Sequence, residues 1–288
     1  MILPGIQLTS RINLILDKTG IDTPETCLDL DHWRNFPDTV HYVYNSRGFR
    51  DAEWPINDLA ECIWCIGDSF TVGVGSKFNN SWTQVLQRIT GRRCVNISLE
   101  GASNAWMVRQ ANMIIQEIAP RNLIIHWSYL HRDENPDSSL TDEDRRIRHI
   151  ADFTTEKQLD HFASSVNQLI DSNYTNIVHS FIPHGIPDWF DKNLSHAWNQ
   201  LRGADWPRDY PRTVSEFECL PDFIKQELRE HSMYYEFFDA AIIHGRITKI
   251  IGTPFISPLD TLDRARDGLH YDVLTSTAFV EQIIELLV

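Results

Sequence analysis

Ser69, Asp267 and His270 are the residues of this 288-residue chain whose types and spacing could do chemistry. Ser69 follows an apolar run, residues 62–66, and lies in the turn that begins at Gly67. A serine hydroxyl is a weak nucleophile unless a base accepts its proton and a third group orients that base. Asp267 stands three residues before His270, so over one turn its carboxylate can hold one ring nitrogen while the other faces Ser69. These residues predict a nucleophile, a general base and the group that orients the base.

The elements around these residues are those of a parallel sheet. Residues 62–66 are typical of a buried strand that ends in a tight turn, and further strands are predicted at residues 93–97, 122–127, 176–182 and, as a candidate fifth, 249–256. Helices are predicted at residues 81–89, 105–118, 157–170, within 216–238 and at 273–287. Strand, glycine loop, helix and strand in succession predict right-handed crossovers and a parallel α/β sheet. Ligands bind at the carboxyl ends of the strands of such sheets, which is where Ser69 lies.

The chain is expected to form one elaborated domain. Residues 1–55 predict an irregular N-terminal cap packed on a main domain of residues 56–288, with Tyr42, Tyr44 and Phe49 as core anchors of the cap. An insertion at about residues 183–235 has no clear periodicity and is either a substrate wall, a lid or interface, or a well-packed excursion. Its candidate wall residues are Trp189, Trp198 and Trp206.

The charge balance limits the partners. Lys and Arg number 26 against 40 Asp and Glu, which gives a formal net charge of −14 at pH 7. Such a surface repels phosphate backbones, so no nucleic-acid partner is expected. No run approaches the length of a membrane helix, and the start of the sequence lacks a signal-peptide layout, which predicts a cytoplasmic or otherwise non-secreted protein. The sequence carries no signal for an oligomeric state.

The cysteine pattern does not indicate a metal or redox site. Cys62 and Cys65 are spaced as CxxC, but along a strand these positions face opposite sides of the sheet and cannot chelate one ion. Buried thiols are expected instead. His179 and His184 flank the end of the fourth predicted strand without a metal-ligand spacing, so they are expected to be structural. We expect no metal and no cofactor.

Three motifs in order resemble the SGNH hydrolase family, also called GDSL esterases and lipases. They are Gly67-Asp68-Ser69 after the first strand, a glycine loop after the second, and Asp267-x-x-His270 near the carboxyl end. The resemblance covers roughly residue 62 to the end. It implies a three-layer α/β/α sandwich with a flavodoxin-like, mainly parallel five-stranded sheet. It also implies a metal-independent serine hydrolase acting on ester bonds, with Ser69 as nucleophile, His270 as general base and Asp267 as its orienter.

The oxyanion site is where the chain departs from that family. Members stabilise the tetrahedral oxyanion with the serine amide, a glycine amide and the asparagine of a GxND motif after the third strand. Gly101 fits the glycine role, because it has no side chain to block a substrate oxygen. The segment after the third strand, which contains Ser128 and Arg132, has neither the glycine nor the asparagine. Asn104 is one substitute donor, although it also fits an ordinary helix cap; Ser128 or Arg132 is another, and a catalytically weak site is the third alternative.

The preferred interpretation is a serine esterase that forms an acyl-enzyme on Ser69. Its substrate would be a small-molecule or glycan ester, with a carbohydrate O-acetyl ester favoured because the tryptophans of the insertion could stack on sugar rings. Two alternatives remain. One is a binding or assembly module with a decayed site, and the other is an acyltransferase that passes the acyl group to a sugar hydroxyl.

Overall fold

The structure is a computed structural model of the chain. It describes residues 6–130, 132–137, 139–141, 144, 148–149, 155–170, 175–182, 219–231, 240–253, 255–256 and 262–288. Trp189, Trp198, Trp206 and His184 lie outside the described residues, as does most of the predicted insertion.

A four-stranded parallel sheet lies at the centre of the molecule. Its strands, in spatial order, are β4 (Cys94–Asn96), β3 (Ile63–Gly67), β5 (Asn122–Trp127) and β8 (Asn176–Phe181). The register pairs Ile63 with both Cys94 and Asn122, so the strands begin level with one another. All four strands are mostly apolar, which fits a parallel sheet that is covered on both faces.

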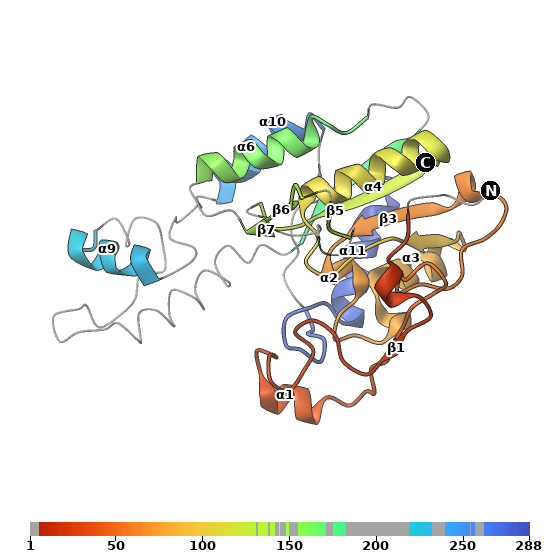
Figure 1. Cartoon of the computed structure of the whole chain (residues 1–288), viewed down its shortest axis with the longest axis horizontal. Coiled ribbons are helices and arrows are strands. Elements are labelled where there is room, and N and C mark those ends of the chain that lie inside the picture. The colour runs from red at the N-terminus through yellow and green to blue at the C-terminus, as the bar shows by residue number, and fades with distance from the viewer. Residues whose placement is uncertain are drawn as a thin grey trace.

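Helices cover both faces of this sheet (Figure 1). On one face lie α3 (Trp82–Thr90) and α11 (Val273–Ile284), which contact each other. On the other lie α4 (Asn104–Glu117), α6 (Thr155–Val166) and α10 (Ala240–Ile251), with α6 in contact with both α4 and α10. The predicted three-layer α/β/α fold class is therefore confirmed.

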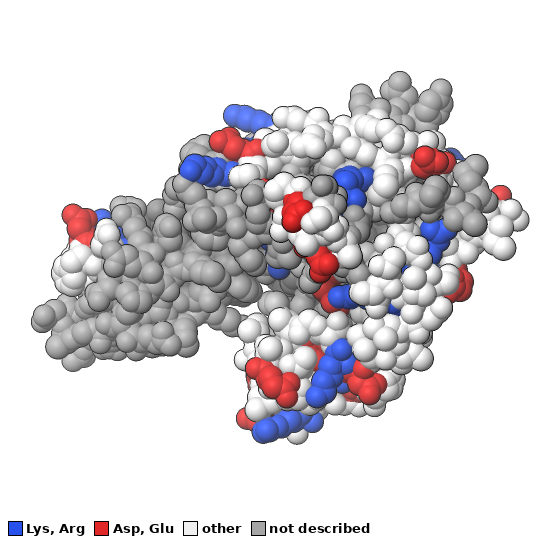
Figure 2. Space-filling model, in the orientation of Figure 1, with Lys and Arg blue, Asp and Glu red and all other residues white. Residues whose placement is uncertain are grey.

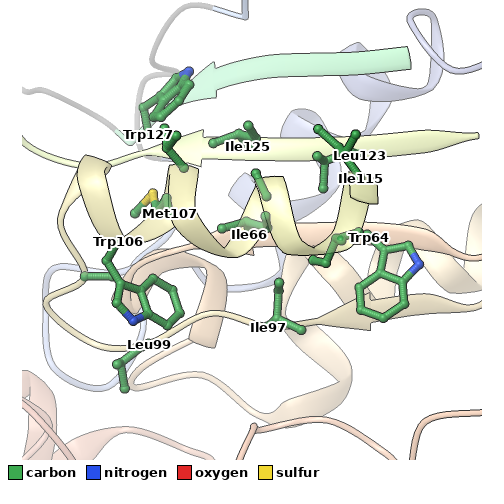
Figure 3. Close-up of a cluster of buried hydrophobic side chains, with 14 of the residues drawn as sticks. Trp64, Ile66, Ile97, Leu99, Trp106, Met107, Ile115, Leu123, Ile125 and Trp127 are labelled. Atoms are coloured by element: carbon green, nitrogen blue, oxygen red, sulfur yellow. The ribbon is translucent and has the colours of Figure 1, made fainter. Parts of the chain in front are cut away.

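The period-two alternation of the strands divides the core into two clusters. Trp64 and Ile66 of β3 pack with side chains of α4 and β5, as Figure 3 shows, whereas Ile63 and Cys65 pack toward α3 and α11. Cys62 belongs to the cluster of Trp64 and is therefore on the opposite face from Cys65, as the spacing predicts. Both thiols are buried and free.

The N-terminal segment is more regular than predicted. A two-stranded antiparallel ribbon joins β1 (Ile15–Leu16) to β2 (Tyr42–Val43), and α1 (Leu30–Asn35) lies between them in the sequence. Tyr42, Tyr44 and Phe49 are all buried, which confirms them as core anchors. The remaining short elements are η1 (Thr9–Arg11), η2 (Leu59–Glu61), α2 (Ser69–Val72), η3 (Phe78–Asn80), β6 (Arg132–Asp133), β7 (Arg148–His149) and α9 (Asp222–His231).

The candidate fifth strand is the main difference from the predicted elements. Residues 249–251 end helix α10, and among the described residues only Ile256 continues the sheet, through one parallel bridge to Ser180. The Ile256 amide donates to the carbonyl of His179 at 2.9 Å. A short apolar run fits a strand and a buried helix equally well, and here the apolar residues extend back to residue 240, long enough for three helical turns.

Over the described residues, no helix combines the length and the apolar character needed to cross a bilayer. Figure 2 shows acidic and basic side chains interspersed on the face that it presents.

Candidate active site

Ser69 lies at the point where β3 ends and α2 begins. The side chain of Asp68 caps this turn, because its Oδ1 accepts a hydrogen bond from the Phe70 amide at 3.0 Å. Asp68 and Phe70 are buried, whereas Ser69 between them is partly exposed. The turn therefore presents the Ser69 hydroxyl at the carboxyl end of a central strand.

The structure brings His270 and Asp267 to this hydroxyl. His270 Nε2 lies 2.8 Å from Ser69 Oγ, and His270 Nδ1 donates to Asp267 Oδ2. Asp267 Oδ1 also accepts from the backbone amides of Leu269 and His270, at 3.0 and 3.1 Å. The carboxylate is completely buried and the imidazole nearly so. Both ring nitrogens thus have partners, and each partner is the one that the sequence predicts.

Burial and partners have opposite effects on the Asp267 carboxylate. Burial by itself raises its pKa, but the adjacent His270 charge and the hydrogen bonds from His270 and Leu269 outweigh burial and lower the pKa below its usual value. Asp267 is therefore held as a carboxylate, the form that can orient an imidazole and stabilise an imidazolium.

An aromatic contact fixes the plane of the imidazole. The ring of Phe70 lies against that of His270 with centroids 4.4 Å apart, and Tyr271 contacts the same phenylalanine at 5.2 Å. Since Phe70 follows the nucleophile directly, the α2 turn holds both the serine and one face of its partner ring.

Gly101 lies in the turn that follows β4. The turn is tied to the end of β3 because the Leu99 amide donates to the Gly67 carbonyl at 3.2 Å, and it closes with a bond from the Ala102 amide to the Leu99 carbonyl at 3.0 Å. Gly101 has a φ of +73°, in the left-handed region that glycine adopts without strain. Its role as an oxyanion donor stays a prediction.

Asn104 is the first residue of α4 and is buried. Its Nδ2 lies 3.4 Å from the Ser128 carbonyl and 3.3 Å from the Tyr129 carbonyl, and its Oδ1 accepts from the Ser128 amide at 2.9 Å. The helix cap is Ser103, whose hydroxyl accepts from the Trp106 amide. Asn104 thus fastens the loop after β5 to α4, and a role as an oxyanion donor would need its Nδ2 to leave these carbonyls.

The other two candidate donors converge on Asp68. Ser128 Oγ donates to Asp68 Oδ2 at 2.6 Å, and Arg132 Nη1 lies 2.9 Å from the same oxygen and 2.8 Å from Ser128 Oγ. The guanidinium of Arg132 also lies over the Tyr129 ring, 4.5 Å from its centroid. The Arg132 guanidinium therefore lies beside the turn that carries the nucleophile. It comes from the segment after the third strand, where the family has its GxND motif and this chain does not.

The predicted structural role of His179 agrees with its surroundings. Its ring stacks on Trp127 at 5.8 Å, and the Trp127 indole donates to its Nδ1 at 3.2 Å. Burial lowers the pKa of His179 to about 4, which keeps it neutral. In the described part of the chain, no three His, Cys, Asp or Glu side chains are grouped as metal ligands.

Several residues around the triad were missed in the sequence. Asp22, Arg50 and Glu100 are buried charged side chains. Asp22 accepts from Arg266, the neighbour of Asp267, and Arg50 donates to the Ser76 carbonyl in the loop that begins beside Ser69. Glu100 precedes Gly101 and accepts from Arg11 of the N-terminal segment. No local pattern identifies them, because their partners are distant in the chain.

Comparisons with known proteins find structural likeness only. No family model matches the sequence. No curated protein matches it either. Solved structures of similar backbone include TesA, at 13% identity over 78% of this chain and 97% of that one with a TM-score of 0.40. By motif order and by fold class, the chain is similar to the SGNH hydrolases.

Two further solved structures are found. One is a carbohydrate acetylesterase family member from Sinorhizobium meliloti, at 13% identity over 78% of this chain and 97% of that one with a TM-score of 0.37. The other is a G-D-S-L family protein from Desulfitobacterium hafniense DCB-2, at 16% identity over 66% and 99% with a TM-score of 0.30. Likeness at these TM-scores carries no argument, so the fold is read from the sheet and its helices, and reaction and substrate are inferred from the site.

Proposed function

We propose that the chain is a serine esterase that cleaves its substrate through an acyl-enzyme on Ser69. The observation that carries the proposal is the continuous hydrogen-bonded path from Ser69 Oγ through the His270 ring to the buried Asp267 carboxylate. A serine beside a histidine is common on protein surfaces, but a partly exposed serine on a histidine that a buried carboxylate orients is the arrangement that activates a hydroxyl.

The residues would act in sequence. Ser69 Oγ attacks the ester carbonyl carbon while His270 Nε2 accepts the hydroxyl proton, and Asp267 stabilises the imidazolium that forms. The tetrahedral intermediate collapses when the carbon–oxygen bond to the leaving group breaks, and the leaving alkoxide takes the proton from His270. A water molecule then attacks the acyl-enzyme in the same way and releases the carboxylic acid and free Ser69.

The oxyanion of both intermediates needs donors. The backbone amides of Ser69 and Gly101 are the proposed pair, since the loop of Gly101 is bonded to the last residue of β3. A missing third donor typically costs about 10² to 10³ in turnover, so this chain is expected to be slower than a fully equipped esterase unless another side chain contributes.

A carbohydrate O-acetyl ester is the substrate class that we propose to test first. The support for it is the tryptophan-rich sequence of the insertion, because indole rings stack on the apolar faces of sugars. Long-chain acyl esters are the competing class.

Active-site labelling tests the reaction. A fluorophosphonate reacts with an activated serine, so the wild-type chain should be labelled at one site while Ser69→Ala and His270→Ala should not. An unlabelled wild-type chain that is folded would refute the proposal and favour the binding-module alternative.

The labelled wild-type chain should then be assayed on acetylated glycans, short-chain esters and long-chain esters, with and without a sugar acceptor. Preference for long acyl chains would refute the O-acetyl assignment. Transfer of the acyl group to the acceptor in place of water would identify a transferase.

A further inference from the structure

The N-terminal segment, residues 6–51, bonds directly to both loops that carry the proposed triad. The nucleophile loop, residues 68–76, contains Ser69, and the base loop, residues 264–271, contains Asp267 and His270. These loops leave different elements of the main domain, and a triad works only while they keep one separation. Contacts outside the triad must therefore fix that separation.

Asp22 is the centre of one connection. Its carboxylate is completely buried and accepts four hydrogen bonds. Arg266 donates two of them, from Nε at 2.9 Å and from Nη2 at 2.6 Å, in a forked ion pair. The Trp33 indole donates the third at 2.8 Å and the Tyr42 hydroxyl the fourth at 2.5 Å. Since Arg266 directly precedes Asp267, this carboxylate anchors the base loop to the N-terminal segment.

Tyr42 carries the connection on to the nucleophile loop. Its hydroxyl oxygen accepts a hydrogen bond from the Gly75 amide at 2.7 Å while its proton goes to Asp22. The Gly75 carbonyl in turn accepts from the Arg266 amide at 2.9 Å. Asp22, Tyr42, Gly75 and Arg266 therefore form a closed ring of hydrogen bonds that includes one residue from each loop.

Other contacts hold the same two loops. Within the base loop, the Asp267 carbonyl accepts from the Leu28 amide at 3.1 Å, and the Ala265 carbonyl accepts from His32 Nε2 at 3.0 Å. On the nucleophile loop, the buried guanidinium of Arg50 donates to three backbone carbonyls, those of Val72, Gly73 and Ser76. These contacts fix each loop separately, whereas the ring through Asp22 joins one loop to the other.

We propose that Asp22 is a positioning residue of the reaction proposed above, and that it acts through Tyr42 and Arg266 to set the distance between Ser69 and the Asp267–His270 pair. The inference rests on the proposed function, because it concerns the same triad. Asp22 touches no reacting atom, so its effect is on the rate at which Ser69 reacts and not on which groups react.

The charge of Asp22 is what the ring depends on. Replacing it by asparagine keeps the shape but removes the negative charge, which leaves the Arg266 guanidinium facing an amide that cannot accept a charged fork in the same way. A buried ion pair that loses one partner rearranges, because an unpaired buried charge is costly. Arg266 would then turn toward water and take the start of the base loop with it.

Fluorophosphonate labelling of Asp22→Asn measures the effect. The final labelled fraction reports how many molecules are folded with a complete site, and the rate constant reports how well the serine is positioned. We expect the labelled fraction to stay at the wild-type level while the rate constant falls roughly 10- to 100-fold, since a displacement of about 1 Å costs about 10² in rate. With an ester substrate, kcat should fall while KM changes little.

Glu134→Gln is the matched control. Glu134 also accepts two hydrogen bonds from one guanidinium, with Arg109 Nη2 at 2.6 Å and Nε at 3.1 Å from its Oε1, but this pair joins α4 to the residue that follows β6 and belongs to neither loop. It should label at the wild-type rate. A loss of labelled fraction with an unchanged rate constant in Asp22→Asn would show a purely structural role and overturn the inference.

Tyr42→Phe tests the same ring if Asp22→Asn does not fold. It removes the hydroxyl that links Gly75 to Asp22 and keeps the ring that lies 4.4 Å from the Arg50 guanidinium. A wild-type rate constant in this variant would also overturn the inference. The failure of the proposed function is distinct, because then the wild-type chain itself would not be labelled.

Discussion

Gly75→Ala is the substitution for which the structure gives the most specific expectation. Gly75 has a φ of +74°, and a Cβ at this position would lie 2.9 Å from the Cβ of Ala265 and 3.0 Å from Oδ1 of Asp267. The methyl group would therefore enter the contact between the nucleophile loop and the base loop. Because the Gly75 amide and carbonyl are both hydrogen-bonded, the backbone cannot retreat without breaking the ring through Asp22.

The magnitude has two parts. An alanine in the left-handed region costs about 1–2 kcal/mol, partly offset by about 0.4–1 kcal/mol because the unfolded chain is less free. Overpacking adds about 1–3 kcal/mol, which gives a loss of about 2–4 kcal/mol in the free energy of unfolding. Ordinary contact begins at 3.4 Å, so Asp267 Oδ1 must move by at least 3.4 − 3.0 = 0.4 Å. At about 10² in rate per 1 Å, this displacement corresponds to a roughly 5- to 10-fold slower reaction of Ser69.

Gly91→Ala is the control for the backbone part alone. Gly91 ends α3 with a φ of +68°, and a Cβ there meets no heavy atom within 4 Å. Urea unfolding and fluorophosphonate labelling of both variants give the comparison. Gly91→Ala should lose only about 1 kcal/mol and label at the wild-type rate. Equal losses of stability and equal labelling rates in the two variants would refute the tight contact between the loops.

Three further results are expected. Asp267→Asn should label about 10² to 10⁴ times more slowly than wild type, because an amide neither holds the required imidazole tautomer nor stabilises its charged form; a wild-type rate would remove Asp267 from the triad. The folded chain should lose up to about 3 kcal/mol of unfolding free energy between pH 6.5 and pH 4 through His179. Burial lowers the pKa of His179 to about 4 in the folded chain, against about 6.5 in the unfolded chain. The stability that comes from the neutral ring is therefore complete above pH 6.5 and is lost as the pH falls to the folded-state pKa. In His179→Gln, the free energy of unfolding in urea should depend less on pH between 6.5 and 4. The same pH dependence as in wild type would exclude His179 as its source. Arg50→Met should cost at least about 3 kcal/mol in the same assay, because it removes the bonds that one buried guanidinium donates to four backbone carbonyls, and a loss within about 0.5 kcal/mol would contradict the bonding described.

The parts of the fold that were predictable are those with local signals. β5 begins and ends at the predicted residues, and β3, β4, β8, α3 and α4 lie within one residue of the predicted bounds at each end, because turn formers and prolines bound their apolar runs. The candidate fifth strand, residues 249–256, was not predictable in the same way. The apolar residues from 240 to 251 form a helix, which short-range periodicity alone could not distinguish from the start of a strand.

In the candidate site, too, the residues with local sequence signals were predictable and those with distant partners were not. Ser69 follows a strand directly, and Asp267 and His270 are three positions apart, so their types and spacing are visible in the sequence. The ring through Asp22 is not, since its members are 20 to 244 positions apart and each looks like an ordinary surface or core residue. Asn104 illustrates a further limit: the sequence places it beside the oxyanion loop, but only the structure places its amide against the Ser128 and Tyr129 carbonyls.

The ion pair between Asp22 and Arg266 joins residues 244 positions apart, and this separation has a consequence for folding. Contacts between distant residues form late, because a long stretch of chain must be ordered before they gain anything. On the ribosome, Arg266 and His270 would emerge only after the whole central sheet has been synthesised. The arrangement that activates Ser69 would therefore be among the last to assemble, and the reactivity of that serine would report that the two ends of the described chain have met.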